Sequence, residues 1–250
     1  MVEIFKKIGL MQKNYKGEVV LAGAGIIFVL GNIFIWSILI LIDYGNKDIL
    51  IKLIYLTAIT GCAGLLDDLK GSNNYRGFIG HLSGLFNGII TTGILKAAAI
   101  FMVSFNVIFT SGSKDYIIIN VGIIILMAHF HNLLDLRPGR CIKFFSIFVI
   151  IALLAKFSFW VYFLPTLIIM IFYSYFELKG KLMLGDTGAY SLGIISGFLT
   201  VNIFDFYVKI FIFFFLLLVT LLSERYSFSR YIKKNKVLHW LDMLGRKSKL

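Results

Sequence analysis

Long apolar runs separated by short polar segments make up most of the chain, and this pattern predicts membrane-spanning helices. Eight runs stand out, at residues 19–42, 49–66, 88–109, 117–134, 142–154, 157–176, 189–201 and 206–222. A helix needs about 20 apolar residues to cross a bilayer, so the shorter runs are expected to extend into their flanks. Residues 142–176 fit either one long helix or a hairpin of two helices around Ala155 and Lys156.

The distribution of positive charge favours the hairpin. With eight spans, the polar segments on the side of the N-terminus hold nineteen of the 25 lysines and arginines, and those on the other side hold five. Lysine and arginine are enriched on the cytoplasmic side of membrane proteins. We therefore predict an all-α integral membrane protein with about eight transmembrane helices and both termini in the cytoplasm. Residues 1–222 would form the transmembrane domain and residues 223–250 a basic amphipathic cytoplasmic tail.

Composition agrees with a chain that has lipid as its solvent. It is 59% hydrophobic and only 15% charged, whereas soluble domains are close to a quarter charged. The net charge of +12 is spread over short loops, so we expect the lipid bilayer as a partner and no nucleic acid. Cys62 and Cys141 have no paired spacing, so neither a disulfide nor a zinc site is expected.

The predicted topology gathers acidic residues on the cytoplasmic side, in three glycine-containing stretches. These are GLLDDLKG with Asp67 and Asp68, HNLLDLRPGR with Asp135, and MLGDTGAYSLG with Asp186. Two carboxylates about 4 Å apart repel by about 4 kcal/mol at an effective dielectric constant near 20. A hard divalent cation such as Mg²⁺ relieves this repulsion and keeps coordination positions open for phosphate oxygens. The nearby cations suit a phosphorylated ligand, namely Lys70, Arg137 and Arg140.

Several of these residues also have simpler interpretations. An aspartate at the end of a span is often only solvated, and Asp186, followed by Thr-Gly, fits an ordinary helix N-cap. Lys96 lies inside the third span, where it could pair with a carboxylate or a phosphate, or extend its ammonium to the membrane surface. His81 could contact a lipid phosphate or be a solvated interfacial histidine.

Together the stretches resemble the motifs of the polyprenyl-phosphate N-acetylhexosamine-1-phosphate transferase superfamily, which includes phospho-N-acetylmuramoyl-pentapeptide transferase. GLLDDLKG resembles the Asp-Asp motif of that superfamily. HNLLD resembles its Asn-Leu-x-Asp motif, with Asn132 and Asp135 in the matching places. LMLGDTGAYSLG resembles its Met-Gly-Asp-x-Gly-Ser motif, with Asp186 on the aspartate. KGEVVLAGAG, residues 16–25, is similar to a degenerate form of its substrate-loop motif.

The resemblance implies a Mg²⁺-dependent enzyme of the plasma membrane that builds a lipid-linked sugar for cell-wall biogenesis. Residues 1–222 would transfer a phospho-sugar, such as phospho-N-acetylhexosamine, from a UDP-sugar to polyprenyl (undecaprenyl) phosphate and release UMP. Asp186 would hold Mg²⁺, Asp68 would support the metal or the nucleotide, and Asp67 would act on or orient the acceptor phosphate. The substrates would be contacted by Lys70, Asn132 and Asp135.

The chain also departs from the superfamily's pattern. Bacterial members have about ten spans and a histidine-rich motif in a late cytoplasmic loop, whereas this chain has eight predicted spans and no cluster of histidines after the eighth. We therefore expect Arg137 and Arg140 to bind pyrophosphate in place of the histidines.

Other functions and arrangements stay open at the level of the sequence. The chain could be an inactive relative that binds polyprenyl lipid or a protein partner, or a transporter, although its acids lie at the membrane rim. The tail could lie on the inner leaflet or cover the active site as a lid. The sugar and the oligomeric state are open, with a homodimer as one alternative.

Overall fold

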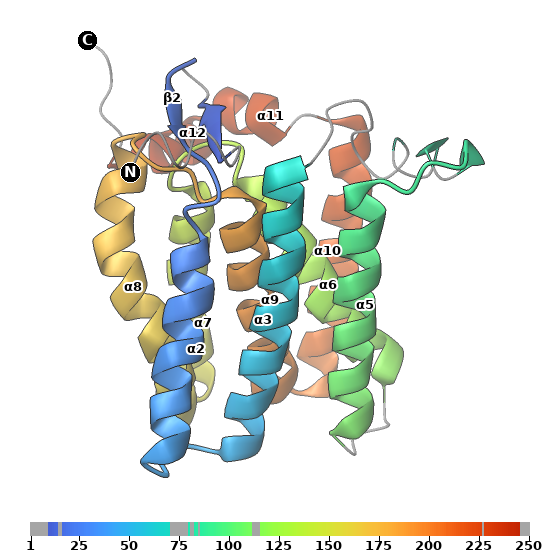
Figure 1. The fold of residues 1–250 in the computed structure, drawn as a ribbon, viewed down its shortest axis with the longest axis vertical. Coiled ribbons are helices and arrows are strands. Elements are labelled where there is room, and N and C mark those ends of the chain that lie inside the picture. The colour runs from blue at the N-terminus through green and yellow to red at the C-terminus, as the bar shows by residue number, and fades with distance from the viewer. Residues whose placement is uncertain are drawn as a thin grey trace.

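The computed structural model describes residues 10–14, 17–70, 80, 83–84, 86–111, 116–226 and 228–245. It is 80% helical, and its long helices stand side by side in one bundle (Figure 1). The predicted all-α class is therefore confirmed for the bulk of the described chain.

Eight apolar helices correspond to the eight predicted runs. They are α2 (Ile26–Leu41), α3 (Lys47–Lys70), α5 (Thr92–Thr110), α6 (Ile117–Leu134), α7 (Arg140–Ala155), α8 (Trp160–Leu178), α9 (Gly185–Ile203) and α10 (Phe206–Arg225). A short 3₁₀ turn, Phe157–Phe159, separates α7 from α8, so the predicted helical hairpin around Lys156 is confirmed. The chain passes up and down the bundle in turn, which brings the ends of α3, α6 and α8 to the starts of α5, α7 and α9 (Figure 1).

Length and composition suit several of these helices to a membrane. Within the described residues, α3, α5, α6, α10 and the segment Phe157–Leu178 are long and apolar enough to cross a bilayer, and α2 is a shorter apolar helix. One face of α10 directs Phe211, Phe214, Leu218 and Leu221 away from the protein. A continuous apolar surface of this kind favours lipid over water. The count of about eight spans and the cytoplasmic termini stay predictions.

Helix α9 is the centre of the bundle. Its residues from Thr187 to Thr200 are all buried, and it packs against α2, α3, α6 and α7. A Cβ atom on Gly193 would lie 2.4 Å from the Cα of Ala128 in α6. A Cβ atom on Gly64 in α3 would lie 2.8 Å from the Cα of Thr187. Glycines at these two contacts therefore allow the backbones to approach closely, as is common between membrane helices.

A small antiparallel sheet precedes the bundle. It pairs β1 (Met11–Lys13) with β2 (Val19–Leu21), and Leu21 forms a further bridge with Leu182, just before α9. The first predicted span, residues 19–42, was expected to be helical from its start, but the helix begins only at Ile26. Gly23 has a positive φ of +67°, which ends the strand and turns the chain into α2.

The C-terminal tail forms two short helices, α11 (Phe228–Lys234) and α12 (Lys236–Met243). Both lie across the end of the bundle at which α3 ends and α9 begins, close to the small sheet (Figure 1). We call this end, which holds Asp67 and Asp186, the site end.

Candidate functional site

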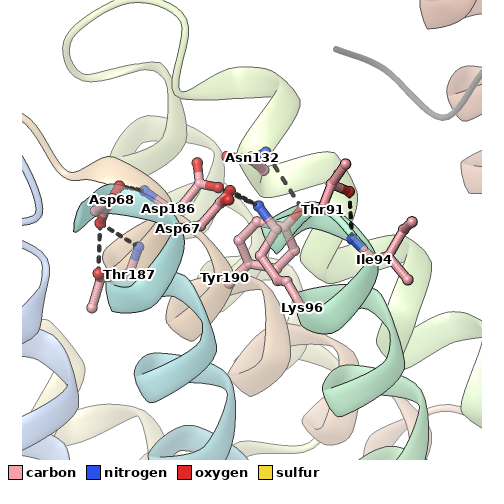
Figure 2. Close-up of polar contacts among 9 residues, drawn as sticks. All are labelled: Asp67, Asp68, Thr91, Ile94, Lys96, Asn132, Asp186, Thr187 and Tyr190. Carbon is pink, nitrogen blue, oxygen red and sulfur yellow. Dashed lines mark hydrogen bonds and ion pairs between the residues drawn. The ribbon is translucent and has the colours of Figure 1, made fainter. Parts of the chain in front are cut away.

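Two of the three acidic stretches meet directly at the site end. Asp67 and Asp68 lie in the last turn of α3, and Asp186 lies in the first turn of α9. Lys96 reaches them from the second turn of α5 (Figure 2). Four side chains from three helices thus converge because α3 ends where α5 and α9 begin.

Lys96 bridges two of the aspartates. Its Nζ lies 2.6 Å from Oδ2 of Asp67 and also donates a hydrogen bond to Oδ2 of Asp186. The side chain of Lys96 is only 9% exposed, whereas those of Asp67 and Asp186 are 18% and 26% exposed. Lys96 was expected either to pair with a carboxylate or a phosphate or to extend its ammonium to the membrane surface. In the structure it pairs with carboxylates. A buried ammonium with two carboxylate partners satisfies the rule that intramembrane charges are paired.

Asp68 turns away from Lys96 and caps helix α9. Its Oδ1 accepts a hydrogen bond from the backbone N–H of Asp186 at 2.9 Å. Its Oδ2 accepts from the backbone N–H and the hydroxyl of Thr187, at 3.0 and 2.6 Å (Figure 2). The first N–H groups of a helix have no partner within the helix, and Asp68 supplies one from α3. Asp186 is therefore not the N-cap that its sequence context suggested, since α9 already begins at Gly185.

Tyr190 and Asn132 form the far side of the Lys96 site. The Nζ of Lys96 lies 4.5 Å from the centre of the Tyr190 ring, a distance at which an ammonium is attracted to the aromatic face. Asn132 in α6 donates a hydrogen bond to the Tyr190 hydroxyl at 3.4 Å. The Asn-Leu-x-Asp stretch is thereby connected to the first two turns of α9.

Asp135 lies beside the cluster in the connection from α6 to α7. It lines a pocket together with Arg137 and Glu177. Burial, with the neighbouring negative charge of Glu177 next in size, raises the pKa of the Asp135 carboxyl well above its usual range. Glu177 is itself buried and accepts a hydrogen bond from the backbone N–H of Gly139. Asp135 thus belongs to the same electrostatic environment as the three clustered aspartates without binding Lys96.

The stretch that resembles a substrate loop packs against the start of α9. The backbone N–H groups of Ala24 and Gly25 donate to the carbonyls of Met183 and Leu184. A Cβ atom on Gly23 would lie 3.1 Å from Oδ2 of Asp68, so there is little room for a larger residue there. All four stretches quoted for the resemblance therefore contribute residues to the site end.

Comparisons with protein-family models, with curated proteins and with solved structures found no match. The resemblance therefore rests on the motifs alone, and the geometry of the site carries the functional argument.

The remaining candidate residues differ in their placement. Lys70 is the exposed last residue of α3, one turn beyond Asp67. Arg137 lines the Asp135 pocket. Arg140, which was expected to bind pyrophosphate, is instead buried and forms a two-pronged ion pair with Asp242 of the tail. His81 lies outside the described residues.

The described residues contain no set of three or more His, Cys, Asp or Glu side chains that could hold a metal ion by itself. The carboxylates of Asp67 and Asp186 nevertheless lie close together, because both contact the Nζ of Lys96. A metal at this place would have to share these two carboxylates with Lys96.

Three residues at the site end were missed by the sequence reasoning. Thr187 was seen only as part of a motif, yet it gives Asp68 two hydrogen bonds. Tyr190, three residues further along α9, was not considered, although the spacing places it on the same side of the helix. The sequence could have indicated a role for Asp242, because it is the only acidic residue in an otherwise basic stretch, residues 225–250.

Proposed function

We propose that this chain is a membrane enzyme that transfers a phospho-sugar from a UDP-sugar to polyprenyl phosphate at the cytoplasmic face and releases UMP. The observation that carries the proposal is the meeting of Asp67, Asp68 and Asp186 at one end of an apolar bundle. Asp68 and Asp186 are 118 residues apart in the sequence, and Asp68 nevertheless binds the backbone of Asp186. The residues that carry the motif resemblance are thus the residues that the fold brings together.

The chemistry of the cluster suits the transfer of a phosphoryl group. In the proposed reaction an oxygen of the acceptor phosphate attacks the β-phosphorus of the UDP-sugar. A new P–O bond forms there, and the bond from the β-phosphorus to the bridging oxygen breaks, so that UMP leaves with that oxygen. Catalysis of such a step is mostly positioning and stabilisation of charge. Asp67 would orient the acceptor phosphate, and the ammonium of Lys96 would exchange a carboxylate for a phosphate oxygen.

The donor set at the site fits Mg²⁺. This ion takes one or two carboxylates and completes its shell with water and phosphate oxygens. Asp67 and Asp186 provide two carboxylates, each bound to Lys96 through Oδ2 and each partly exposed. Both oxygens of Asp68 already accept hydrogen bonds from α9, so Asp68 would position Asp186 rather than bind the metal. When bound, Mg²⁺ would supply positive charge to the pyrophosphate of the nucleotide sugar.

The proposal is tested with purified protein, undecaprenyl phosphate, Mg²⁺ and a panel of UDP-sugars, with UMP release as the readout. Asp67→Asn and Asp186→Asn should lower turnover by at least about a hundredfold, since Asp67 would orient the acceptor phosphate and Asp186 would hold Mg²⁺. Asp205→Asn is the matched control, because Asp205 caps α10 and asparagine caps a helix equally well. Absence of UMP release from every sugar, with the wild type and Asp186→Asn alike, would reject the enzyme.

One observation favours a second candidate, a relative that binds polyprenyl phosphate without chemistry. Lys96 already pairs with both Asp67 and Asp186, so each of these carboxylates has a positively charged partner without a metal. A binding protein would retain a labelled polyprenyl phosphate in the absence of Mg²⁺ and would release no UMP. The enzyme would require Mg²⁺ for UMP release.

A further inference from the structure

The tail helices are attached to the bundle by polar contacts. Arg140 at the start of α7 binds Asp242 of α12 through Nε and Nη2, at 2.7 and 2.8 Å. Its Nη1 donates to the hydroxyl of Ser229 in α11 at 2.9 Å. Lys143 donates to the backbone carbonyls of Leu241 and Asp242. Both tail helices are thus held at the same point of the site end.

This attachment fixes which side of α12 faces the protein. Arg140 and Asp242 are 7% and 8% exposed, so their ion pair is buried between α7 and α12. Charge-assisted bidentate pairs of this kind have a defined geometry. The side of α12 that carries Asp242 therefore faces the start of α7.

The opposite side of α12 is apolar and uncovered. Trp240 and Leu241 lie three and four residues after Val237, which places the three side chains on one side of the helix, and Leu244 follows as the C-cap residue. The exposed fractions of Val237, Trp240, Leu241 and Leu244 are 67%, 62%, 39% and 41%. Tryptophan and aliphatic side chains on one face of a short surface helix are typical of helices that lie in the membrane interface.

Exposed positive charge lies on the same two tail helices as this apolar face. Four basic side chains of the tail helices are exposed, namely Arg230, Lys233, Lys234 and Lys236. The one acid within these helices, Asp242, is already neutralised by Arg140. Each lysine or arginine close to a negatively charged bilayer contributes about 1 kcal/mol of attraction. An apolar face with a basic rim is complementary to anionic lipid, in which acyl chains lie beneath negative headgroups.

We propose that α11 and α12 form a binding surface for anionic lipid, which the Arg140–Asp242 pair holds against the bundle so that Trp240 enters the bilayer interface. Arg140, which the sequence suggested as a substrate ligand, then positions this surface. The inference is independent of the proposed transferase activity, because none of these residues contacts Asp67, Lys96 or Asp186 in the hydrogen bonds and ion pairs of the described chain.

The test uses the full chain in nanodiscs of phosphatidylcholine alone or with about one third phosphatidylglycerol, a fraction that gives a strongly negative surface. The fluorescence of Trp240 is taken as the difference between the wild type and Trp240→Phe. Brominated acyl chains should quench this difference signal in the anionic discs, and aqueous iodide should not. Quenching by bromolipid should fall in neutral discs.

Two variants test whether the dependence on phosphatidylglycerol comes from the basic residues of the tail or from positive charge elsewhere on the protein. Arg230→Gln/Lys233→Gln/Lys234→Gln/Lys236→Gln should lose the dependence on phosphatidylglycerol. The matched control, Lys179→Gln/Lys181→Gln, removes two exposed lysines from the same end of the bundle but outside the tail, and it should keep the dependence.

A third variant tests the attachment. Asp242→Ala should increase hydrogen exchange of residues 236–245 in both kinds of disc, because α12 is then no longer fixed to α7. Quenching of Trp240 by iodide in anionic discs would overturn the proposal. Protection of Trp240 from both quenchers would also overturn it, because the face would then be covered by protein, such as a second copy of the chain.

Discussion

Replacement of Lys96 by methionine is the most informative perturbation of the ion bridge. Methionine keeps the length and much of the volume of the lysine stem but removes the ammonium that Asp67 and Asp186 share. Because both carboxylates contact the same nitrogen, they lie within about 5 Å of each other, and their repulsion is about 3 kcal/mol at an effective dielectric constant near 20. Loss of one partner from a buried ion pair costs about 3–5 kcal/mol, in agreement with this figure.

The expected result is a large loss of thermal stability. For a chain of this size, 1 kcal/mol corresponds to a shift in Tm of about 2–4 °C, so Lys96→Met should lower the Tm in detergent by roughly 10 °C. Lys52→Met is the matched control. Lys52 pairs with Asp48 at the other end of α3, but the Asp48 side chain is 68% exposed, and pairs with such an exposed partner contribute less than about 1 kcal/mol.

A double-mutant cycle tests the cause. Asp67→Asn removes the repulsion between Asp67 and Asp186 that Lys96→Met creates, so the double variant should be more stable than the sum of the two single losses predicts. A Tm of Lys96→Met close to that of Lys52→Met, together with additive losses in the double variant, would refute the ion bridge as a stabilising element of the site.

Three further predictions follow from the same contacts. Asp68→Ala removes the acceptor for the first N–H groups of α9 and the partner of Thr187, and should lower stability by about 1–3 kcal/mol in denaturant titrations; an unchanged midpoint would contradict the capping role. Gly193→Leu forces a side chain into the backbone of Ala128 and should abolish monodisperse elution in size-exclusion chromatography; wild-type elution would argue against the close contact of α6 and α9. Burial raises the pKa of Asp135, so the folded state binds this proton more tightly than the unfolded state and loses stability as the pH rises above the usual aspartate pKa. Asp135→Asn should flatten that fall in Tm between acidic and neutral pH, and an identical pH profile would contradict the raised pKa.

The helices were largely predictable from the sequence, because a bilayer imposes simple rules on length and polarity. The run at residues 117–134 has the same bounds as α6, and the balance of positive charge correctly favoured two helices around Lys156. The predicted start of the first helix was wrong, because Val19–Leu21 pairs with β1 as a strand. Apolar content alone does not distinguish a short strand from a helix.

The roles of individual side chains were less predictable, because they depend on contacts between distant segments. Nothing in the order of two adjacent aspartates indicates that Asp68 turns to α9 while Asp67 turns to Lys96. The sequence allowed Lys96 either to pair with an acidic group or to extend to the membrane surface, and only the packing of α5 against α3 decides between the two. Arg140 looked like a phosphate ligand because its partner, Asp242, lies 102 residues further along the chain.

Transfer of a phospho-sugar by the cluster at the site end can be followed with a label on the β-phosphate of the donor. Purified protein is incubated with undecaprenyl phosphate, Mg²⁺ and a UDP-sugar that carries radioactive phosphorus at the β-position, and the lipid is extracted. The label should move into the lipid fraction with an equal amount of UMP released. Asp186→Asn and Asp67→Asn should prevent this transfer, and Asp205→Asn should not. A label that stays in the aqueous fraction for every UDP-sugar, or that reaches the lipid equally well with Asp186→Asn, would contradict transfer by this cluster.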